Sequence, residues 1–330
     1  MNLLVLGGSG FVGRAVVAEA LGRGWTVTTF NRGREPIAGT EPLVGDRLRP
    51  ADVSVLNGRR WDCVVDTWAG APRAVAASAA LLAEAAERYV YVSSESVYEH
   101  PPPLGADESA PTVSASPEAE GGEYAELKRG GELAAAAAFG ERSLFARAAT
   151  ILGPHENIGR LPWWLLRMER GGEVLCPGPR EQPIQYVDAR DLARWLLDAA
   201  AGGASGPFNV ACRRGHATMG DLLDACLDAT GTNAELVWVP PEHIVASGIE
   251  GWSELPVWLA PGHEYAWMHD MSVERAHAAG LRCQPPADTV SDTWKWLESI
   301  EKRPPLNENA APGLDAAKER AALAAWHKPV

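Results

Sequence analysis

The residue types best suited to chemistry are a tyrosine and a lysine four positions apart, Tyr124 and Lys128, in the segment YAELK. In a helix, side chains at positions i and i+4 share one face, so the phenol and the ammonium would lie close together. A phenol has an ordinary pKa of about 10 and is a poor base near neutral pH. A neighbouring ammonium favours the phenolate, which would let Tyr124 take a proton from an alcohol or return one to an alkoxide. The pair therefore indicates general acid–base chemistry.

A hydroxyl group for the same chemistry is available in the segment VSSESVY, residues 92–98. This segment continues the apolar run YVYVS, which predicts a buried strand over residues 89–93. In open α/β sheets, ligands bind in the crevice at the carboxyl ends of the strands. A serine at that edge could donate a hydrogen bond to a substrate carbonyl oxygen and orient the substrate for Tyr124.

A glycine-rich loop, GGSGFVG, occupies residues 7–13, between an apolar strand-like run and a segment with helical periodicity. Its glycines allow a tight turn, a close approach of the backbone to pyrophosphate and close packing of helix on strand. The phosphates of a dinucleotide would lie at the amino end of the helix, where backbone N–H groups can donate to them. We therefore expect the loop to bind a dinucleotide through Gly7, Ser9, Gly10, Phe11, Val12 and Gly13.

The choice between NAD and NADP depends on the end of the second strand, where residues 30–34 are FNRGR. An NAD enzyme usually carries Asp or Glu there to bond the ribose 2′-hydroxyl, and a carboxylate would repel a 2′-phosphate. The neutral Asn31, followed by Arg32 and Arg34, favours NADP(H), with Arg32 as the direct phosphate partner and NAD as the alternative. Asp46, in the pair Gly45-Asp46 that follows a further strand expected after the second one, would either face the adenine or simply close a turn.

The elements that must position these residues alternate between strands and helices. Apolar runs predict strands at residues 2–6, 25–30, 61–66, 89–93, 143–148 and 207–210. Helical patterns predict helices at residues 11–21, 72–88, 118–139, 187–201 and 314–326. Continuously apolar strands that alternate with helices predict an α/β fold, a Rossmann-type doubly wound parallel sheet with both faces covered.

After Gly153 the alternation of strand-like and helical segments becomes irregular, which predicts a second, smaller region. We expect residues 1–150, with about 186–210, to form the NADP-binding Rossmann domain. Residues of about 151–185 and 211–303 would form a C-terminal substrate-binding lobe. Residues 304–330 would complete the chain, with a linker at 304–312 followed by a docking helix.

The motifs GGSGFVG, SSESVY and YAELK, in this order and spacing, resemble the extended short-chain dehydrogenases/reductases and their atypical relatives. That superfamily contains nucleotide-sugar epimerases, dehydratases and reductases. The resemblance implies that the catalytic hydroxyl lies four residues before the tyrosine of the VY pair, which selects Ser94 rather than Ser93 or Ser96. It also implies that Tyr124 is the acid/base and that Lys128 both assists it and bonds the nicotinamide ribose.

The resemblance covers roughly residues 1–210, and the chain departs from it in two places. Sugar 4,6-dehydratases place Asp-Glu after their hydroxyl residue, whereas Glu95-Ser96 supplies only one acid here. This disfavours 4,6-dehydration and leaves the role of Glu95 open. Asn31 replaces the family's frequent Asp, and a preference for a 2′-phosphate fits a reductase that releases its NADP(H) better than an epimerase that retains NAD.

We therefore expect an NADP(H)-dependent oxidoreductase that moves a hydride to or from a carbonyl or alcohol of a small molecule, such as a sugar nucleotide or secondary metabolite. An NAD(P)-dependent sugar epimerase that retains its cofactor is the alternative within the same fold. A non-catalytic dinucleotide-sensing or RNA-binding protein is the alternative of another class, although such relatives often lose the Tyr–Lys pair. Family members are frequently dimers, so the resemblance is compatible with a homodimer.

The composition of the chain indicates which binding partners and which cellular compartment to expect. The 330 residues carry a formal net charge of −13, which disfavours binding to nucleic acid. No apolar stretch approaches the roughly 20 residues of a membrane span, and the strand-like run directly after Met1 leaves no room for a signal peptide. The 5 cysteines include no CxxC pair, and the 8 histidines form no close metal-binding pair. We expect a cytoplasmic protein with reduced thiols and no metal site.

Overall fold

The computed structural model describes residues 1–330 except 34, 308–309, 311–312 and 329–330. Its internal contacts divide the chain into two compact units. The first comprises Met1–Ala149, Ala189–Ala211 and Met271–Arg282, and the second comprises Thr150–Asp188, Cys212–Asp270 and Cys283–Val330. The glycine loop, the serine segment and the Tyr–Lys pair all belong to the first unit.

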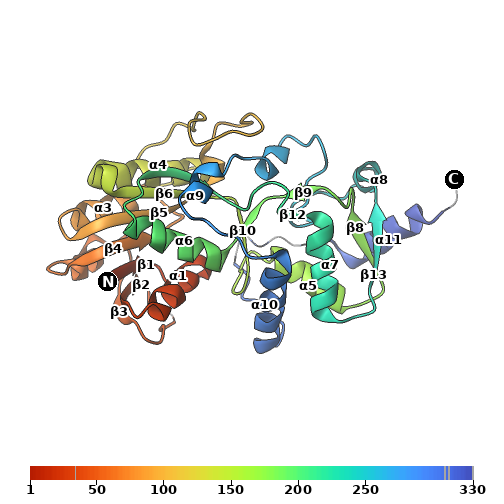
Figure 1. The fold of residues 1–330 in the computed structure, drawn as a ribbon, viewed down its shortest axis with the longest axis horizontal. Coiled ribbons are helices and arrows are strands. Elements are labelled where there is room, and N and C mark those ends of the chain that lie inside the picture. Colours follow the sequence, from red (N-terminus) through yellow and green to blue (C-terminus); the bar gives the residue numbers. More distant parts are fainter. Residues whose placement is uncertain (34, 308–309, 311–312, 329–330) are drawn as a thin grey trace. The chain divides into compact units, whose positions relative to one another are not determined.

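A seven-stranded sheet, parallel throughout, forms the centre of the first unit. Its strands lie in the order β11-β6-β5-β4-β1-β2-β3, so the chain winds outward from β1 in both directions (Figure 1). This confirms the predicted Rossmann-type sheet, in which the carboxyl ends of all strands meet at one edge. The strands are β1 (Asn2–Leu6), β2 (Thr26–Asn31), β3 (Glu41–Val44), β4 (Trp61–Asp66), β5 (Ala86–Ser94), β6 (Ser143–Ala148) and β11 (Gly206–Val210).

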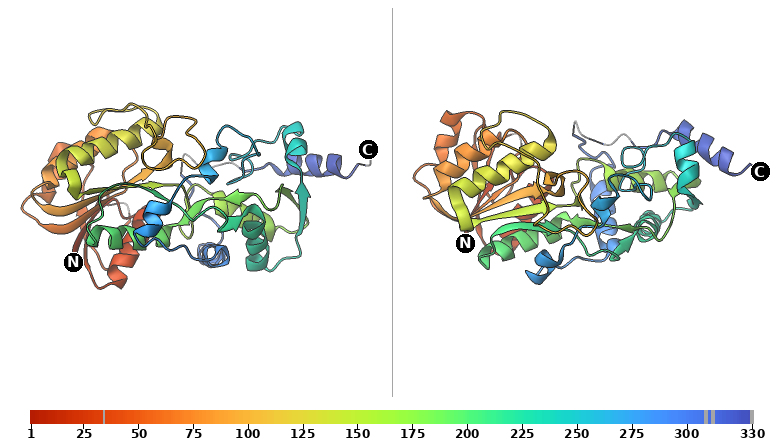
Figure 2. Two further views of the ribbon diagram at one scale, coloured as in Figure 1. Left: turned by 45° about the horizontal axis from the view of Figure 1, so that its top comes forward. Right: turned by 90° about the horizontal axis from the view of Figure 1, so that it is seen from above.

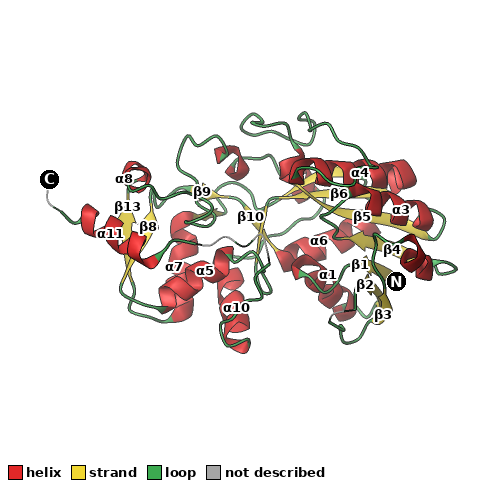
Figure 3. Cartoon of the chain, turned by 180° about the vertical axis from the view of Figure 1, so that it is seen from behind, coloured by secondary structure: helices red, strands yellow, loops and turns green. Residues whose placement is uncertain are grey.

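Helices cover both faces of this sheet because its strands are apolar on both sides. Helices α1 (Phe11–Gly22) and α6 (Ala189–Ala201) pack together on one face, and α3 (Pro72–Leu82) and α4 (Tyr124–Phe139) on the other (Figures 1 and 3). The core beneath α3 and α4 contains Leu6, Phe30, Leu82, Tyr91 and Phe139. The short elements of this unit are α2 (Pro50–Val53), α9 (Glu274–Ala278) and the 3-10 helices η1 (Ser54–Leu56), η2 (Glu95–Val97) and η3 (Gly140–Arg142).

The second unit has its own core, built around three helices that pack on one another (Figure 2). These helices are α5 (Arg160–Glu169), α7 (Met219–Thr230) and α10 (Pro286–Ser299). The second unit also contains three two-stranded sheets: β7 (Thr150–Leu152) with β10 (Tyr186–Asp188), β8 (Glu173–Pro177) with β13 (Glu235–Val239), and β9 (Pro183–Ile184) with β12 (Ala217–Thr218). The remaining helices are α8 (Pro241–Ala246), η4 (Ala266–His269) and α11 (Ala316–Trp326). Glu319 anchors α11, because its buried carboxylate accepts from Arg167 Nε at 2.8 Å and from the Leu175 amide at 3.1 Å.

Two of the predicted helices in the first unit have wrong boundaries. The helix predicted over 72–88 ends at Leu82, because the chain from Ala86 onward pairs with β4 as strand β5. The helix predicted over 118–139 begins only at Tyr124. Glu123 caps it in a reciprocal capping box with Glu126, which fixes the start of the helix at the residue predicted to do chemistry.

Two further helix starts are also corrected. The helix predicted from Val187 begins at Ala189, because Tyr186–Asp188 pairs with β7 as strand β10. The last helix begins at Ala316 rather than Leu314, because the Asp315 carboxylate accepts from the amides of Ala317 and Lys318 and so caps it. Four residues of the predicted linker 304–312 lie outside the described residues.

Candidate active site

The glycine loop forms a tight turn between β1 and α1. Gly7 and Gly8 have φ angles of +122° and +92°, a region that strains any residue with a Cβ atom. A Cβ on Gly13 would lie 2.6 Å from the Gly8 amide nitrogen, so the third glycine is needed for α1 to approach the loop. Among the described residues, no side chain caps the amino end of α1. Its first N–H groups can therefore donate to phosphate oxygens.

The space in front of Gly10 is suited to the phosphates of a dinucleotide. A Cβ built on Gly10 has no heavy atom within 4 Å, so open space lies directly in front of the amino end of α1. A cavity of about 280 Å³ adjoins the loop. Its lining comes from the carboxyl ends of β1, β2, β3 and β4 and includes Gly7, Ser9, Arg32, Asp46 and Trp68. The donor set and the space both fit the adenosine and phosphate part of a nicotinamide dinucleotide.

The Asn31 side chain is engaged within the loop region itself. Its Nδ2 donates to the Gly7 carbonyl at 3.0 Å, and its Oδ1 accepts from the Gly33 amide at 2.8 Å. Asn31 thus ties the end of β2 to the glycine loop. Arg32, the next residue, is exposed at the cavity. Arg34, the other arginine of the prediction, lies outside the described residues.

Asp46 lies in the wall of the same cavity and closes a turn. Its Oδ1 accepts from the Leu48 amide at 3.0 Å, and its own amide donates to Asp52 Oδ2 at 2.9 Å. The sequence left two roles open for this residue, an adenine contact and a turn. The turn is present, at a position that also borders the cavity.

The three residues predicted to be catalytic belong to β5 and α4. Ser94 is the last residue of β5, and its hydroxyl lies 3.1 Å from the Ser96 hydroxyl while accepting from the Ser96 amide at 3.2 Å. Ser93 Oγ instead donates to Glu132 Oε1 at 2.8 Å, and both serines are buried, Ser93 with 3% and Ser94 with 9% of its surface exposed. Tyr124 is 50% exposed, and its ring centroid lies 6.0 Å from Lys128 Nζ. Glu95, whose role was left open, is buried in η2.

Lys128 is the most constrained member of the group. It is 3% exposed, and its ammonium donates to the carbonyls of Trp68 at 2.9 Å and Val92 at 2.7 Å. Burial lowers the pKa of Lys128 from 10.5 to about 8, while the negative charges of Asp66 and Glu132 oppose this drop. The ammonium therefore remains mostly charged at neutral pH, with one N–H beyond the two that bond carbonyls.

Two adjacent glycines let α4 carry Lys128 close to the sheet. A Cβ on Gly130 would lie 2.5 Å from Pro72 Cγ, and a Cβ on Gly131 would overlap the Tyr91 hydroxyl. Tyr91 lies beneath the lysine, with its ring centroid 5.1 Å from Lys128 Nζ. The glycines therefore allow the helix to sit close enough for the ammonium to reach backbone carbonyls at the sheet.

Sequence reasoning missed several residues beside this group. Arg14 supports the glycine loop, because its Nε donates to the Ser9 carbonyl at 2.8 Å. Asp66 and Arg47 form a buried ion pair between the glycine loop and Lys128. An acid at the carboxyl end of the apolar run WDCVVD was a signal for Asp66. No signal pointed to Arg47, because the pair joins residues 19 positions apart.

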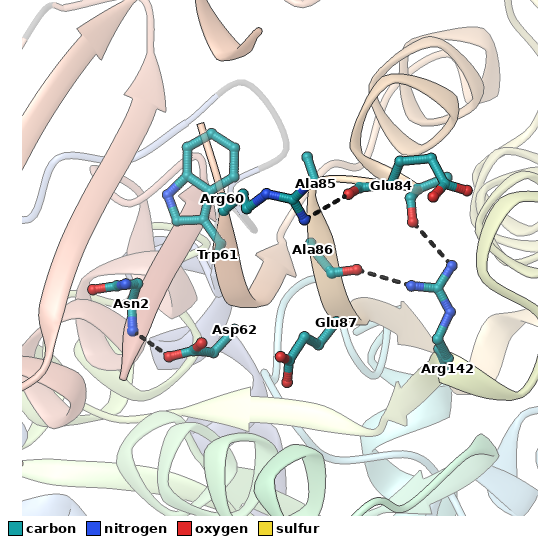
Figure 4. Close-up of a pocket in the computed structure, with 10 residues that line it drawn as sticks. Asn2, Arg60, Trp61, Asp62, Glu84, Ala85, Ala86, Glu87 and Arg142 are labelled. Atoms are coloured by element: carbon teal, nitrogen blue, oxygen red, sulfur yellow. Dashed lines mark hydrogen bonds between the residues drawn. The ribbon is translucent and has the colours of Figure 1, made fainter. Parts of the chain in front are cut away.

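A second cavity in the first unit, of about 450 Å³, lies at the opposite edge of the sheet (Figure 4). Asn2, Trp61 and Ala86, the first residues of their strands, contribute to its lining. Arg142 there donates to the carbonyls of Ala86 at 2.8 Å and Ala83 at 3.0 Å. This cavity is remote from the glycine loop and plays no part in the candidate site.

Among the described residues, no group of three or more His, Cys, Asp or Glu side chains is arranged to hold a metal ion. In the same part of the chain, none of the helices has the length and hydrophobicity that a bilayer crossing requires.

Comparison with known proteins gives a family and a fold. The model of the NAD dependent epimerase/dehydratase family matches residues 3–80 and 51–211. No curated protein matches the chain. Among solved structures, the Bordetella bronchiseptica enzyme WbmG in complex with NAD and UDP has a TM-score of 0.66 at 17% identity, over 94% of this chain and 99% of that one.

Two UDP-glucose 4-epimerases have the same fold. The Thermus thermophilus enzyme, solved in complex with NAD, has a TM-score of 0.63 at 20% identity, over 89% of this chain and 99% of that one. The Thermotoga maritima enzyme, solved with UDP-glucose, has a TM-score of 0.64 at 18% identity, over 91% of this chain and 100% of that one.

Proposed function

The chain belongs to the NAD dependent epimerase/dehydratase family, and from that premise we propose that it is an NADP(H)-dependent oxidoreductase acting on a carbonyl or alcohol of a small molecule. The family match makes it an enzyme of the extended short-chain dehydrogenase/reductase type that uses a nicotinamide dinucleotide. The observation that carries the proposal is the pairing of a half-exposed phenol, Tyr124, with a buried ammonium, Lys128, in the unit that holds the glycine loop.

The chemistry divides between the cofactor and three side chains. A bound nicotinamide dinucleotide supplies the hydride acceptor or donor. The Tyr124 oxygen takes a proton from the substrate alcohol in oxidation and returns it to the substrate oxygen in reduction. The Lys128 ammonium stabilises the negative phenolate oxygen, and its remaining N–H is available to a ribose hydroxyl. Ser94 would exchange its contact with Ser96 for a hydrogen bond to the substrate oxygen.

The preference for NADP over NAD rests on the end of β2. Asn31 has no carboxylate that could bind a ribose 2′-hydroxyl, and its side-chain amide is already hydrogen-bonded to Gly7 and Gly33. Arg32 is exposed at the cavity, and a guanidinium is suited to a phosphate because it donates in a planar fork. Gly7, Ser9, Gly10, Phe11, Val12, Gly13 and Asp46 would form the rest of the cofactor site.

Sugar nucleotides are the substrate class that we favour, with the second unit supplying most of the substrate contacts. The fold neighbours include an enzyme solved with UDP and an epimerase solved with UDP-glucose. These neighbours also favour a second candidate function, a sugar epimerase that retains NAD and shows no net consumption of cofactor. A cytoplasmic location fits either activity, because both use a cellular dinucleotide.

The test begins with the purified protein and its bound nucleotide. The oxidoreductase function predicts that the protein is isolated largely free of dinucleotide, binds NADPH more tightly than NADH in calorimetry, and consumes NADPH with a member of a panel of sugar nucleotides and small ketones. Stoichiometric NAD that survives purification, with sugar interconversion and no net NADPH consumption, would favour the epimerase instead. If the protein binds neither dinucleotide at millimolar concentration, both functions are wrong.

A further inference from the structure

The turn that follows β4, residues 66–68, holds the Lys128 ammonium from one side. The Trp68 carbonyl accepts from Lys128 Nζ at 2.9 Å and from the Tyr91 hydroxyl at 3.0 Å. The Trp68 amide donates to Asp66 Oδ1 at 2.9 Å. Hydrogen bonds therefore fix both peptide groups of Trp68: Asp66 accepts from its N–H, and Lys128 and Tyr91 donate to its carbonyl oxygen.

Asp66 is itself held rigidly. It is 0% exposed, and its carboxylate accepts from both terminal nitrogens of Arg47, at 2.5 Å and 2.8 Å, and from the Tyr89 hydroxyl at 2.5 Å. Arg47 also donates to Ser78 Oγ at 2.5 Å, and its guanidinium stacks over the Trp68 ring at 5.1 Å. A carboxylate with this many donors cannot rotate without breaking several hydrogen bonds.

Two negative charges act on Lys128, those of Asp66 and Glu132. Asp66 of β4 and Glu132 of α4 are buried acids, and each is paired with a buried arginine, Arg47 and Arg147 respectively. The phenols nearby are Tyr89 and Tyr91 of β5 and Tyr124 of α4. Asp66 contacts the turn that Lys128 binds, whereas Arg47 bonds to Asp66, Ser78 and Ala74 rather than to the lysine. Asp66 is therefore the member of the pair that hydrogen bonds link to Lys128, through the peptide groups of Trp68.

We propose that Asp66, fixed by Arg47, is a positioning residue for Lys128. It holds the residue 66–68 turn so that the Trp68 carbonyl directs the ammonium toward the cofactor side, and its charge keeps that ammonium protonated. The importance of this role for catalysis rests on the proposed function, but the interaction itself does not. In this role Asp66 acts through Lys128.

The experiment is a titration of the lysines by NMR, which requires neither substrate nor cofactor. The chain contains only five lysines, so [13C]lysine labelling gives few Cε signals, and the variant Lys128→Arg identifies the signal of Lys128. The test variant is the double substitution Asp66→Asn with Arg47→Met. It removes both charges, leaves neither partner buried alone, and keeps an oxygen that accepts from the Trp68 amide. The matched control, Ser78→Ala, removes one contact of Arg47 and leaves Asp66 in place.

In the wild type we expect Lys128 to titrate near pH 8. In the double variant the pKa of Lys128 should fall by about one unit, a tenfold shift in its protonation equilibrium, while Ser78→Ala should leave it unchanged within about 0.3 units. A fall of less than half a unit would overturn the proposal. A wild-type Lys128 that titrates below pH 7 would overturn it as well, even if the double variant fails to fold, because the ammonium would then be mostly unprotonated at neutral pH. Neither outcome would decide whether Tyr124 is catalytic.

Discussion

Replacing Lys128 by methionine should change the stability of the protein in a way that depends on pH. Methionine has a similar length and no charge, so it removes the buried ammonium while filling most of its space. The Lys128 pKa of 10.5 in the unfolded chain falls to about 8 in the folded protein. This difference means that the folded state releases the lysine proton more easily than the unfolded state does.

The size and sign of the effect follow from linkage. Below about pH 8 both states are protonated, and the buried charge costs the wild type about 3 kcal/mol. Between about pH 8 and 10.5 the unfolded state binds more protons than the folded state, so the stability of the wild type rises with pH relative to the variant. Of the about 3 kcal/mol, roughly 2 kcal/mol should be recovered between pH 7 and pH 9.5.

The assay is urea unfolding of the wild type and of Lys128→Met at pH 7 and pH 9.5. The stability difference between the two proteins at one pH also contains the lost hydrogen bonds to Trp68 and Val92, but that contribution is common to both pH values. The change with pH therefore isolates the charge. Lys295→Met, in which an exposed ammonium is lost, serves as the control and should show no such change. A Lys128→Met difference that is the same at both pH values would refute the reasoning.

Three further predictions concern the reaction and its cofactor. Tyr124→Phe should reduce kcat to background while the Kd for NADPH, measured by calorimetry, stays within about threefold; substantial residual turnover would exclude Tyr124 as the acid/base. Arg32→Ala should weaken NADPH binding by about tenfold, roughly 1.4 kcal/mol, and NADH binding much less. Equal losses for the two dinucleotides would rule out a contact between Arg32 and the 2′-phosphate. Gly10→Ala should leave Tm within about 2 °C but reduce cofactor affinity, since its Cβ enters the open space before α1. Gly13→Ala should lower both, because its Cβ meets the Gly8 backbone. Unchanged cofactor affinity in Gly10→Ala would mean that the dinucleotide does not approach this position.

The sequence predicted the sheet because its signals are local. The strands β1, β4 and β6 are short, mostly apolar runs, and their observed bounds match those predicted. The motif residues could be found for the same reason, since a glycine loop and an i, i+4 pair are each contained in one short segment. The predicted start of α4 was wrong because Glu118, Ala119 and Glu120 favour a helix, whereas Gly121 and Gly122 separate them from it and the capping box depends on side-chain geometry.

The surroundings of Lys128 could not be read in this way. The Asp66–Arg47 pair, the Trp68 carbonyl and the Tyr91 ring come from segments that are far apart in the sequence and meet only when the sheet assembles. The sequence indicated that a lysine lay one helical turn from a tyrosine, but its burial and its bonds to backbone carbonyls are tertiary properties. For this reason the sequence predicted the reacting groups better than the residues that control them.

The glycine pair in α4 has a consequence for engineering. Protein stabilisation often begins by exchanging helix-interior glycines for alanine, which favours the helix by about 1 kcal/mol per site in an exposed position. At Gly130 and Gly131 the exchange would push the helix away from Pro72 and Tyr91. Stabilising substitutions should therefore be made at other positions, because moving α4 away from the sheet would also move Lys128 away from the backbone carbonyls that it binds.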